Sequence, residues 1–185
     1  MVSGLYTDLT VVHEPKLHDL YEYWDAKRRG RAMPSRADLD PVEIPDLLAN
    51  LILVDVSGSP PQFRIRLAGT DIVTRYGAEL TGKRLDDIDL GSDLAQIKEQ
   101  YEETALKVVP TYCRHFIETR KRKLLRYERL LMPLSGDGST VNMLLGGIYP
   151  LPPELAAEGA MVAAPDHQES RGSGQGVVLL RAKAG

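Results

Sequence analysis

The side chains in this sequence best suited to metal binding or nucleophilic chemistry are four histidines and one cysteine. His13, His18, His115 and His167 are scattered without the spacing of metal ligands, so we expect solvated or hydrogen-bonded structural histidines. Cys113 lies in a β-type segment without an evident activating partner, which favours a small buried hydrophobic residue. The sequence therefore predicts neither a metal site nor thiol chemistry.

Two short segments resemble functional motifs but fit structural roles better. The segment Asp86-Asp87-Ile88-Asp89 places three carboxylates close together in a loop. Carboxylates in a loop are more often solvated than used in acid–base catalysis. Ser135-Gly136-Asp137-Gly138-Ser139 lacks the lysine and the strand-to-helix setting of a phosphate-binding loop, which favours a turn. No catalytic residue is indicated, and we expect the chain not to be an enzyme.

A basic stretch runs from Arg114 to Arg129, where seven arginine and lysine residues outnumber two glutamates. A solvated hairpin that discourages edge-to-edge pairing explains this bias. An anionic ligand or an acidic partner is the alternative. The net charge of −3 gives no general attraction to nucleic acid or anionic membranes, so we expect neither as a partner.

Composition indicates one soluble globular domain. The 185 residues are 43% hydrophobic and 26% charged, and the single cysteine excludes an internal disulfide. The N-terminus lacks the pattern of a secretory signal, and no apolar run approaches the roughly 18 residues that span a bilayer. We therefore expect a cytoplasmic protein without membrane insertion.

Residues 63–82, FRIRLAGTDIVTRYGAELTG, are the central segment among the elements that would position a site. Phe63 to Leu67 alternate apolar and basic residues, as in a strand with one buried face. Gly69 permits a backbone conformation or a close approach that a side chain would hinder. Thr70 is the expected N-cap of a short helix, and Gly82 is its expected end. The simplest interpretation is a strand that packs around a tight turn into a helix.

Two helical segments are predicted before this element. Residues 15–29 form the first, with an apolar stripe of Leu17, Leu20, Tyr21 and Trp24. The arginines and aspartates of residues 31–41 could tie the next loop down through charge-assisted hydrogen bonds. Asp40 is then the expected N-cap of a short helix to about Asn50, in which Pro45 must either lie in the first turn or start a fresh one.

The strongest helix is predicted over residues 92–108, with Ser92 as its N-cap. Its apolar stripe is Leu94, Ile97, Tyr101 and Val108, and its expected wet face is Gln96, Glu99, Gln100, Glu103 and Lys107. Strands are predicted over residues 51–56, 63–67, 111–119, 124–133 and 140–149. We expect an α+β fold with residues 1–50 as an N-terminal helical extension, 51–150 as the core and 151–185 as a flexible tail, in which 177–180 could pair or dock.

This order of elements resembles a PAS domain, and several segments are similar to the bacterial family of short stand-alone PAS-like proteins, PAS_5. The similarity lies in Tyr23-Trp24, residues 33–41 (MPSRADLDP), residues 63–70 with Tyr76-Gly77 and Leu80-Thr81-Gly82, and residues 127–134 (YERLLMPL). It covers roughly residues 17–149. It implies a five-stranded antiparallel sheet with helices on one face and an N-terminal helical extension. It also implies signal transduction through small-ligand binding, protein contact or both, and no catalytic residue.

The cofactors common in PAS domains fit this sequence poorly. Haem-binding members take a proximal histidine from the long helix or its neighbourhood, and residues 92–108 contain none. The Asn-Cys-Arg-Phe-Leu motif of flavin photoreceptors is absent from the sequence. Haem, photoactive flavin and metal are therefore disfavoured, and the cofactor is left unassigned.

A pocket is expected between the long helix and the sheet, and its candidate residues are Leu67, Ile72, Tyr76, Leu80, Ile97, Tyr101, Met132, Met143 and Leu145. Such walls suit a small organic ligand, and equally a packed core. One hypothesis is thus a sensory binding module that signals to a partner protein. The second is a ligand-free interaction module or homodimer, in which Leu17, Tyr21 and Trp24 dock the first helix on the sheet or on another copy. An enzyme on a cone-like α+β scaffold is a third alternative.

Overall fold

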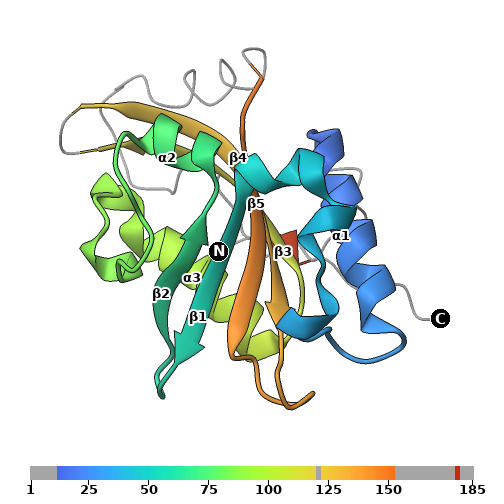
Figure 1. Ribbon diagram of the computed structural model, residues 1–185. Coiled ribbons are helices and arrows are strands. Elements are labelled where there is room, and N and C mark those ends of the chain that lie inside the picture. The colour runs from blue at the N-terminus through green and yellow to red at the C-terminus, as the bar shows by residue number, and fades with distance from the viewer. Residues whose placement is uncertain (1–11, 120–121, 153–177, 180–185) are drawn as a thin grey trace.

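The computed structural model describes residues 12–119, 122–152 and 178–179 (Figure 1). An antiparallel sheet with the strand order β2-β1-β5-β4-β3 lies at its centre. The strands are β1 Leu51–Ser57, β2 Gln62–Ala68, β3 Thr111–Glu118, β4 Leu124–Leu134 and β5 Met143–Pro150. The two residues of β6, Val178–Leu179, pair with Tyr112 and Thr111 at the outer edge of β3. The predicted five-stranded antiparallel sheet of an α+β fold is confirmed, and β6 extends it.

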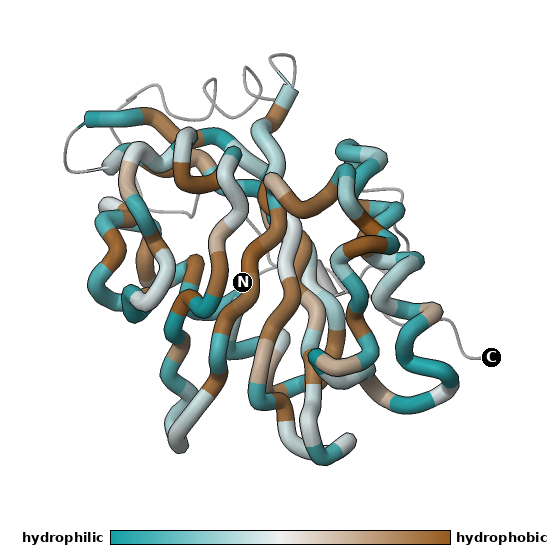
Figure 2. Tube along the Cα trace, viewed as in Figure 1, coloured by the Kyte–Doolittle hydropathy of each residue, from teal (hydrophilic) through white to brown (hydrophobic). Residues whose placement is uncertain are grey.

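Helices cover both faces of this sheet. Three α-helices, α1 Pro15–Arg28, α2 Thr70–Tyr76 and α3 Leu94–Lys107, are joined by the 3-10 turns η2 Arg36–Asp38, η3 Pro41–Glu43, η4 Pro45–Asn50, η5 Leu85–Asp87 and η6 Gly91–Asp93. Figure 1 shows α1 on the opposite side of the sheet from α2 and α3. Figure 2 shows hydrophobic residues concentrated along the central strands between these layers. No helix among the described residues has the length and apolar character to cross a membrane.

The packing of α1 against the sheet depends on Gly147 of β5. A Cβ atom at Gly147 would lie 2.6 Å from Leu17 Cδ2 and 2.9 Å from Leu20 Cδ2. Only a residue without a side chain lets the apolar stripe of α1 approach so closely. The predicted helical extension is therefore part of the core.

Helix ends differ from the sequence prediction at three positions. The N-cap of α2 is Gly69, one residue before the predicted Thr70, and α2 ends at Gly77 instead of Gly82. Gly77 adopts a left-handed conformation with φ of 86°, which ends a helix without steric penalty. The N-cap of α3 is Asp93 instead of Ser92.

The predicted close approach at Gly69 is confirmed. Its N–H donates to the Leu51 carbonyl oxygen at 2.8 Å, and a Cβ atom at this position would lie 2.3 Å from the Ala49 carbonyl oxygen. The φ of Gly69 is −64°, an ordinary value, so only the missing side chain matters here. Gly69 thereby joins β2, η4 and the start of α2.

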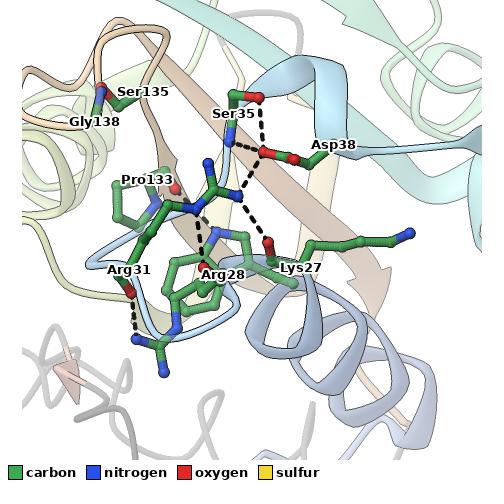
Figure 3. A network of polar contacts seen from close by, with 9 residues as sticks. Lys27, Arg28, Arg31, Ser35, Asp38, Pro133, Ser135 and Gly138 are labelled. Carbon is green, nitrogen blue, oxygen red and sulfur yellow. Dashed lines mark hydrogen bonds and ion pairs between the residues drawn. The ribbon is translucent and has the colours of Figure 1, made fainter.

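The loop after α1 is held by charge-assisted hydrogen bonds, as predicted (Figure 3). Asp38 accepts from Ser35 N and Oγ, both at 2.7 Å, and from Arg31 Nη2 at 2.8 Å. Arg31 also donates to the carbonyl oxygens of Lys27 and Arg28 at the end of α1. The bonds from Ser35 and Arg31 hold the pKa of Asp38 well below its ordinary value.

The short helix predicted after this loop is divided in two. Asp40 Oδ1 accepts from Val42 N at 3.0 Å and caps η3, and Pro45 begins η4. Proline lacks the N–H that would continue η3, so η3 ends before Pro45 and the new 3-10 turn η4 begins there.

Candidate functional site

A cavity of about 80 Å³ lies between the sheet and the layer that contains α2, η5 and α3. This volume is several times the roughly 10–15 Å³ that one water molecule occupies on the same measure. Its walls consist of nine aliphatic, three tyrosine and three arginine side chains: Ile52, Ile65, Ile72, Leu80, Leu85, Ile88, Leu90, Leu125, Ile148, Tyr76, Tyr101, Tyr127, Arg75, Arg126 and Arg129.

Four of the nine predicted pocket residues line this cavity, namely Ile72, Tyr76, Leu80 and Tyr101. Ile97 is fully buried in α3 but packs elsewhere in the core. Leu67 does not line the cavity and is 44% exposed. The pairing of β1 with β2 skips Arg66 between the partners of Leu53 and Val54, and this bulge breaks the alternation that would have turned Leu67 inward.

Met132, Met143 and Leu145 lie on the opposite face of the sheet, contrary to the sequence prediction. Met132 pairs with Leu145, two positions from the pair formed by Leu130 and Gly147. Because strand side chains alternate between faces, Met132 and Leu145 share the face on which Gly147 contacts α1. Met143 lies on that face as well, two residues from Leu145.

The predicted interaction residues of α1 are buried against the chain's own sheet. Leu17 and Trp24 are 0% and 1% exposed, and Tyr21 is 8% exposed. Trp24 Nε1 donates to the Pro133 carbonyl oxygen of β4 at 2.9 Å. Of the two surfaces expected for this stripe, the sheet is thus the one that it occupies in the structure.

The most polar group in the cavity wall is Arg129, whose side chain comes from the middle of β4 and is only 2% exposed. Its Nε and Nη2 both donate to Gln100 Oε1 of α3, at 2.9 and 2.7 Å. The guanidinium carbon lies 4.7 Å from the centre of the Tyr101 ring and 5.9 Å from that of Tyr127. Hydrogen bonds to a neutral amide and cation–π contacts therefore hold this cation.

His115 of β3 completes the buried cluster. His115 Nε2 lies 3.0 Å from Arg129 Nη2 and 3.3 Å from Gln100 Oε1. Burial, reinforced by the adjacent Arg129, lowers the pKa of His115 well below 6.5. The imidazole is therefore neutral, and its buried Nδ1 has no hydrogen-bond partner among the described residues.

Gln100, Arg129 and His115 form one cluster that the sequence pattern does not predict. Gln100 was predicted on the wet face of the long helix and is in fact 0% exposed. A sequence signal existed, because Gln100 lies three residues after Ile97 and next to Tyr101 and therefore borders the apolar stripe of the helix. Arg129 belongs to the basic stretch for which the sequence predicts a solvated hairpin, with an anionic ligand or an acidic partner as the alternative, and it lies two residues from Tyr127 on the same strand face.

The position of Cys113 does not fit flavin–thiol chemistry. Its side chain belongs to β3, is 4% exposed and does not line the cavity. Sγ donates to the Arg114 carbonyl oxygen at 3.7 Å, and burial raises the pKa of the thiol to about 11. No cluster of three or more potential metal ligands occurs within the described part of the chain.

The strand order, the helices α2 and α3 over one face and the cavity beneath them define a PAS-like domain. The sequence model of the PAS domain family PAS_5 matches residues 12–149. The chain therefore belongs to the PAS_5 family. No curated protein sequence matches it.

Solved structures with the same fold are distant in sequence. A light-oxygen-voltage domain studied with a flavin analogue aligns with a TM-score of 0.50 at 16% identity, over 65% of this chain and 90% of that one. The Rhodobacter sphaeroides LOV protein aligns with a TM-score of 0.48 at 16% identity, over 66% and 74%. The PAS domain of Bordetella pertussis BvgS gives 0.45 at 15% identity, over 67% and 97%. Similarity at these identities concerns the fold alone.

Proposed function

We propose that this chain is a sensory module of signal transduction that binds a small organic molecule in the cavity and thereby changes its contacts with a partner protein. The observation that carries the proposal is the cavity itself, which combines apolar walls with the buried Arg129 cluster. A ligand there would contact α2, α3 and the sheet at once, so binding could shift the packing of these elements.

Native mass spectrometry and an absorption spectrum of the protein purified from a bacterial host test this proposal. We expect a bound small molecule that is lost in Ile72→Phe, because the larger ring fills space in a cavity of about 80 Å³. The control is Leu48→Phe, which makes the same kind of change at a residue that is 38% exposed and outside the cavity. Protein free of ligand, and not stabilised by any member of a small-molecule library, would contradict the proposal.

The ligand-free interaction module makes a different prediction. Because the α1 stripe already lies on the sheet, contact between copies through Trp24 requires α1 to leave that position. A dimer that dissociates in Trp24→Ala while the monomer stays folded would favour this alternative.

A further inference from the structure

We infer that the ligand of this cavity is a small organic acid, with an apolar body against the aliphatic walls and a carboxylate on Arg129. The inference rests on the proposed function, and it follows from the charges and donors that surround the cavity. Its three arginines, Arg75, Arg126 and Arg129, face no acidic residue in the cavity wall. Arg75 has the Asp71 carboxylate nearby and Arg126 is exposed, so Arg129 is the buried positive charge of this wall.

Arg129 is the deepest of these cations and lacks a counter-ion. No carboxylate among the described residues lies within ion-pair distance of its guanidinium, and its partners are neutral: Gln100, His115 and two tyrosine rings. Burial of a guanidinium carries a desolvation penalty, which a carboxylate relieves better than neutral acceptors do. The site is therefore suited to an anion.

Arg129 also has donors to spare. Nε and Nη2 are used by Gln100 and His115, but Nη1, with its two N–H groups, has no acceptor among the described residues. Arg75 donates through Nη2 to Asn50 Oδ1 at 2.6 Å and to the Ile148 carbonyl oxygen at 2.8 Å, and it is only partly buried, whereas Arg129 is 2% exposed. Arg129 Nη1 is thus the natural contact for a ligand oxygen.

A carboxylate fits these donors better than a phosphate ester. A carboxylate brings one charge and two oxygens, whereas a phosphate monoester carries nearly two charges and three strongly accepting oxygens. The Arg129 cluster supplies one cationic group with a single uncommitted nitrogen. Nine aliphatic residues and a volume of about 80 Å³ then favour a short apolar body.

Calorimetric titration of the full chain with matched compounds tests this inference. The probes are hexanoate and 3-phenylpropanoate, their neutral amides, and hexyl phosphate. We expect an acid to bind at least tenfold more tightly than its amide, and Arg129→Met to remove this preference. The control is Arg66→Met, because Arg66 also lies on the sheet but is exposed and outside the cavity. If Arg129→Met does not fold, Arg129→Lys should keep the preference for acids with weaker binding.

The outcomes separate this inference from the proposed function. Amides that bind as tightly as acids, or an acid preference that survives in folded Arg129→Met, would overturn the inference and leave the proposed function standing. Tighter binding of hexyl phosphate than of hexanoate would overturn the assignment of a carboxylate. If neither acids nor amides bind and the protein carries no other ligand, both proposals fail.

Discussion

Gln100 Oε1 and the Arg129 guanidinium are joined by two hydrogen bonds, at 2.9 and 2.7 Å, that connect α3 to the middle of the sheet. The amide of the same glutamine donates from Nε2 to the carbonyl oxygens of Thr111 and Arg129 at 3.1 and 3.3 Å. One buried side chain thus satisfies a cation and two backbone groups of different strands.

Replacement of this glutamine should be costly. Gln100→Leu leaves the Arg129 cation with one neutral acceptor and removes two hydrogen bonds to buried backbone carbonyls, so we expect the free energy of unfolding in urea to fall by about 3 kcal/mol or more. Gln96→Leu makes the same change at a partly exposed position of α3 and should alter stability by less than about 1 kcal/mol. Equal effects of the two substitutions would contradict the role given to Gln100.

Gly69→Ala should disrupt the junction between β2 and α2. The added Cβ atom would lie 2.3 Å from the Ala49 carbonyl oxygen, and backbone must move to admit it. We expect a loss of about 3 kcal/mol or more in thermal or urea unfolding. Gly136→Ala is the control, because its Cβ atom would meet only the Asn142 side chain, at 3.2 Å. Similar stability of both variants would show that Gly69 is not under steric constraint.

Trp24→Ala should destabilise the protein by about 3–5 kcal/mol, because it removes a side chain that is 1% exposed and a hydrogen bond to the Pro133 carbonyl oxygen. Trp24→Phe keeps most of the volume and should retain a folded protein. Light scattering after gel filtration should give Trp24→Phe the same mass as the native protein, because Trp24 contacts its own sheet. A change of mass in folded Trp24→Phe would instead place this residue between copies.

The neutral state of His115 makes stability depend on pH. Its pKa is depressed in the folded protein, whereas the unfolded chain binds a proton near 6.5, so the unfolded state holds more protons below that pH. Stability from this residue is present above about pH 6.5 and is lost as the pH falls towards the folded-state pKa. Unfolding free energies measured from pH 7.5 to 5 should decrease more steeply for the native protein than for His115→Gln, by up to about 1 kcal/mol per pH unit. Parallel curves would indicate that the folded protein also protonates His115.

Local patterns predicted much of the fold. Alternation in Phe63 to Leu67 and the apolar stripe of α1 gave the strand and the helix, and Gly69 was correctly assigned to a close approach. These features depend on spacing within one segment, which the sequence displays directly. Pairing between segments was harder to predict. The bulge at Arg66 and the face chosen by Met132 depend on register, and a shift of one residue reverses the face.

The site itself was predicted in part. Tyr76 and Tyr101 were placed in the cavity wall, because aromatic residues on a helix stripe face the core. The sequence favours solvent for Gln100, and for Arg129 it leaves open a solvated hairpin or contact with an anion, because polar side chains are usually exposed. Each is buried only because the other, together with His115, provides its hydrogen bonds across three elements. Such reciprocal burial depends on tertiary packing.

Methyl NMR of isoleucine-labelled protein tests the central claim, that the cavity is the ligand site, most directly. Ile52, Ile65, Ile72, Ile88 and Ile148 line the cavity, whereas Ile44, Ile97 and Ile117 do not. Titration with a panel of small organic acids and their amides should yield a binder that shifts the δ1-methyl signals of the first group and leaves those of Ile44 and Ile117 nearly unchanged. Binders that perturb only the second group, or a panel that shifts no cavity methyl signal, would contradict this account.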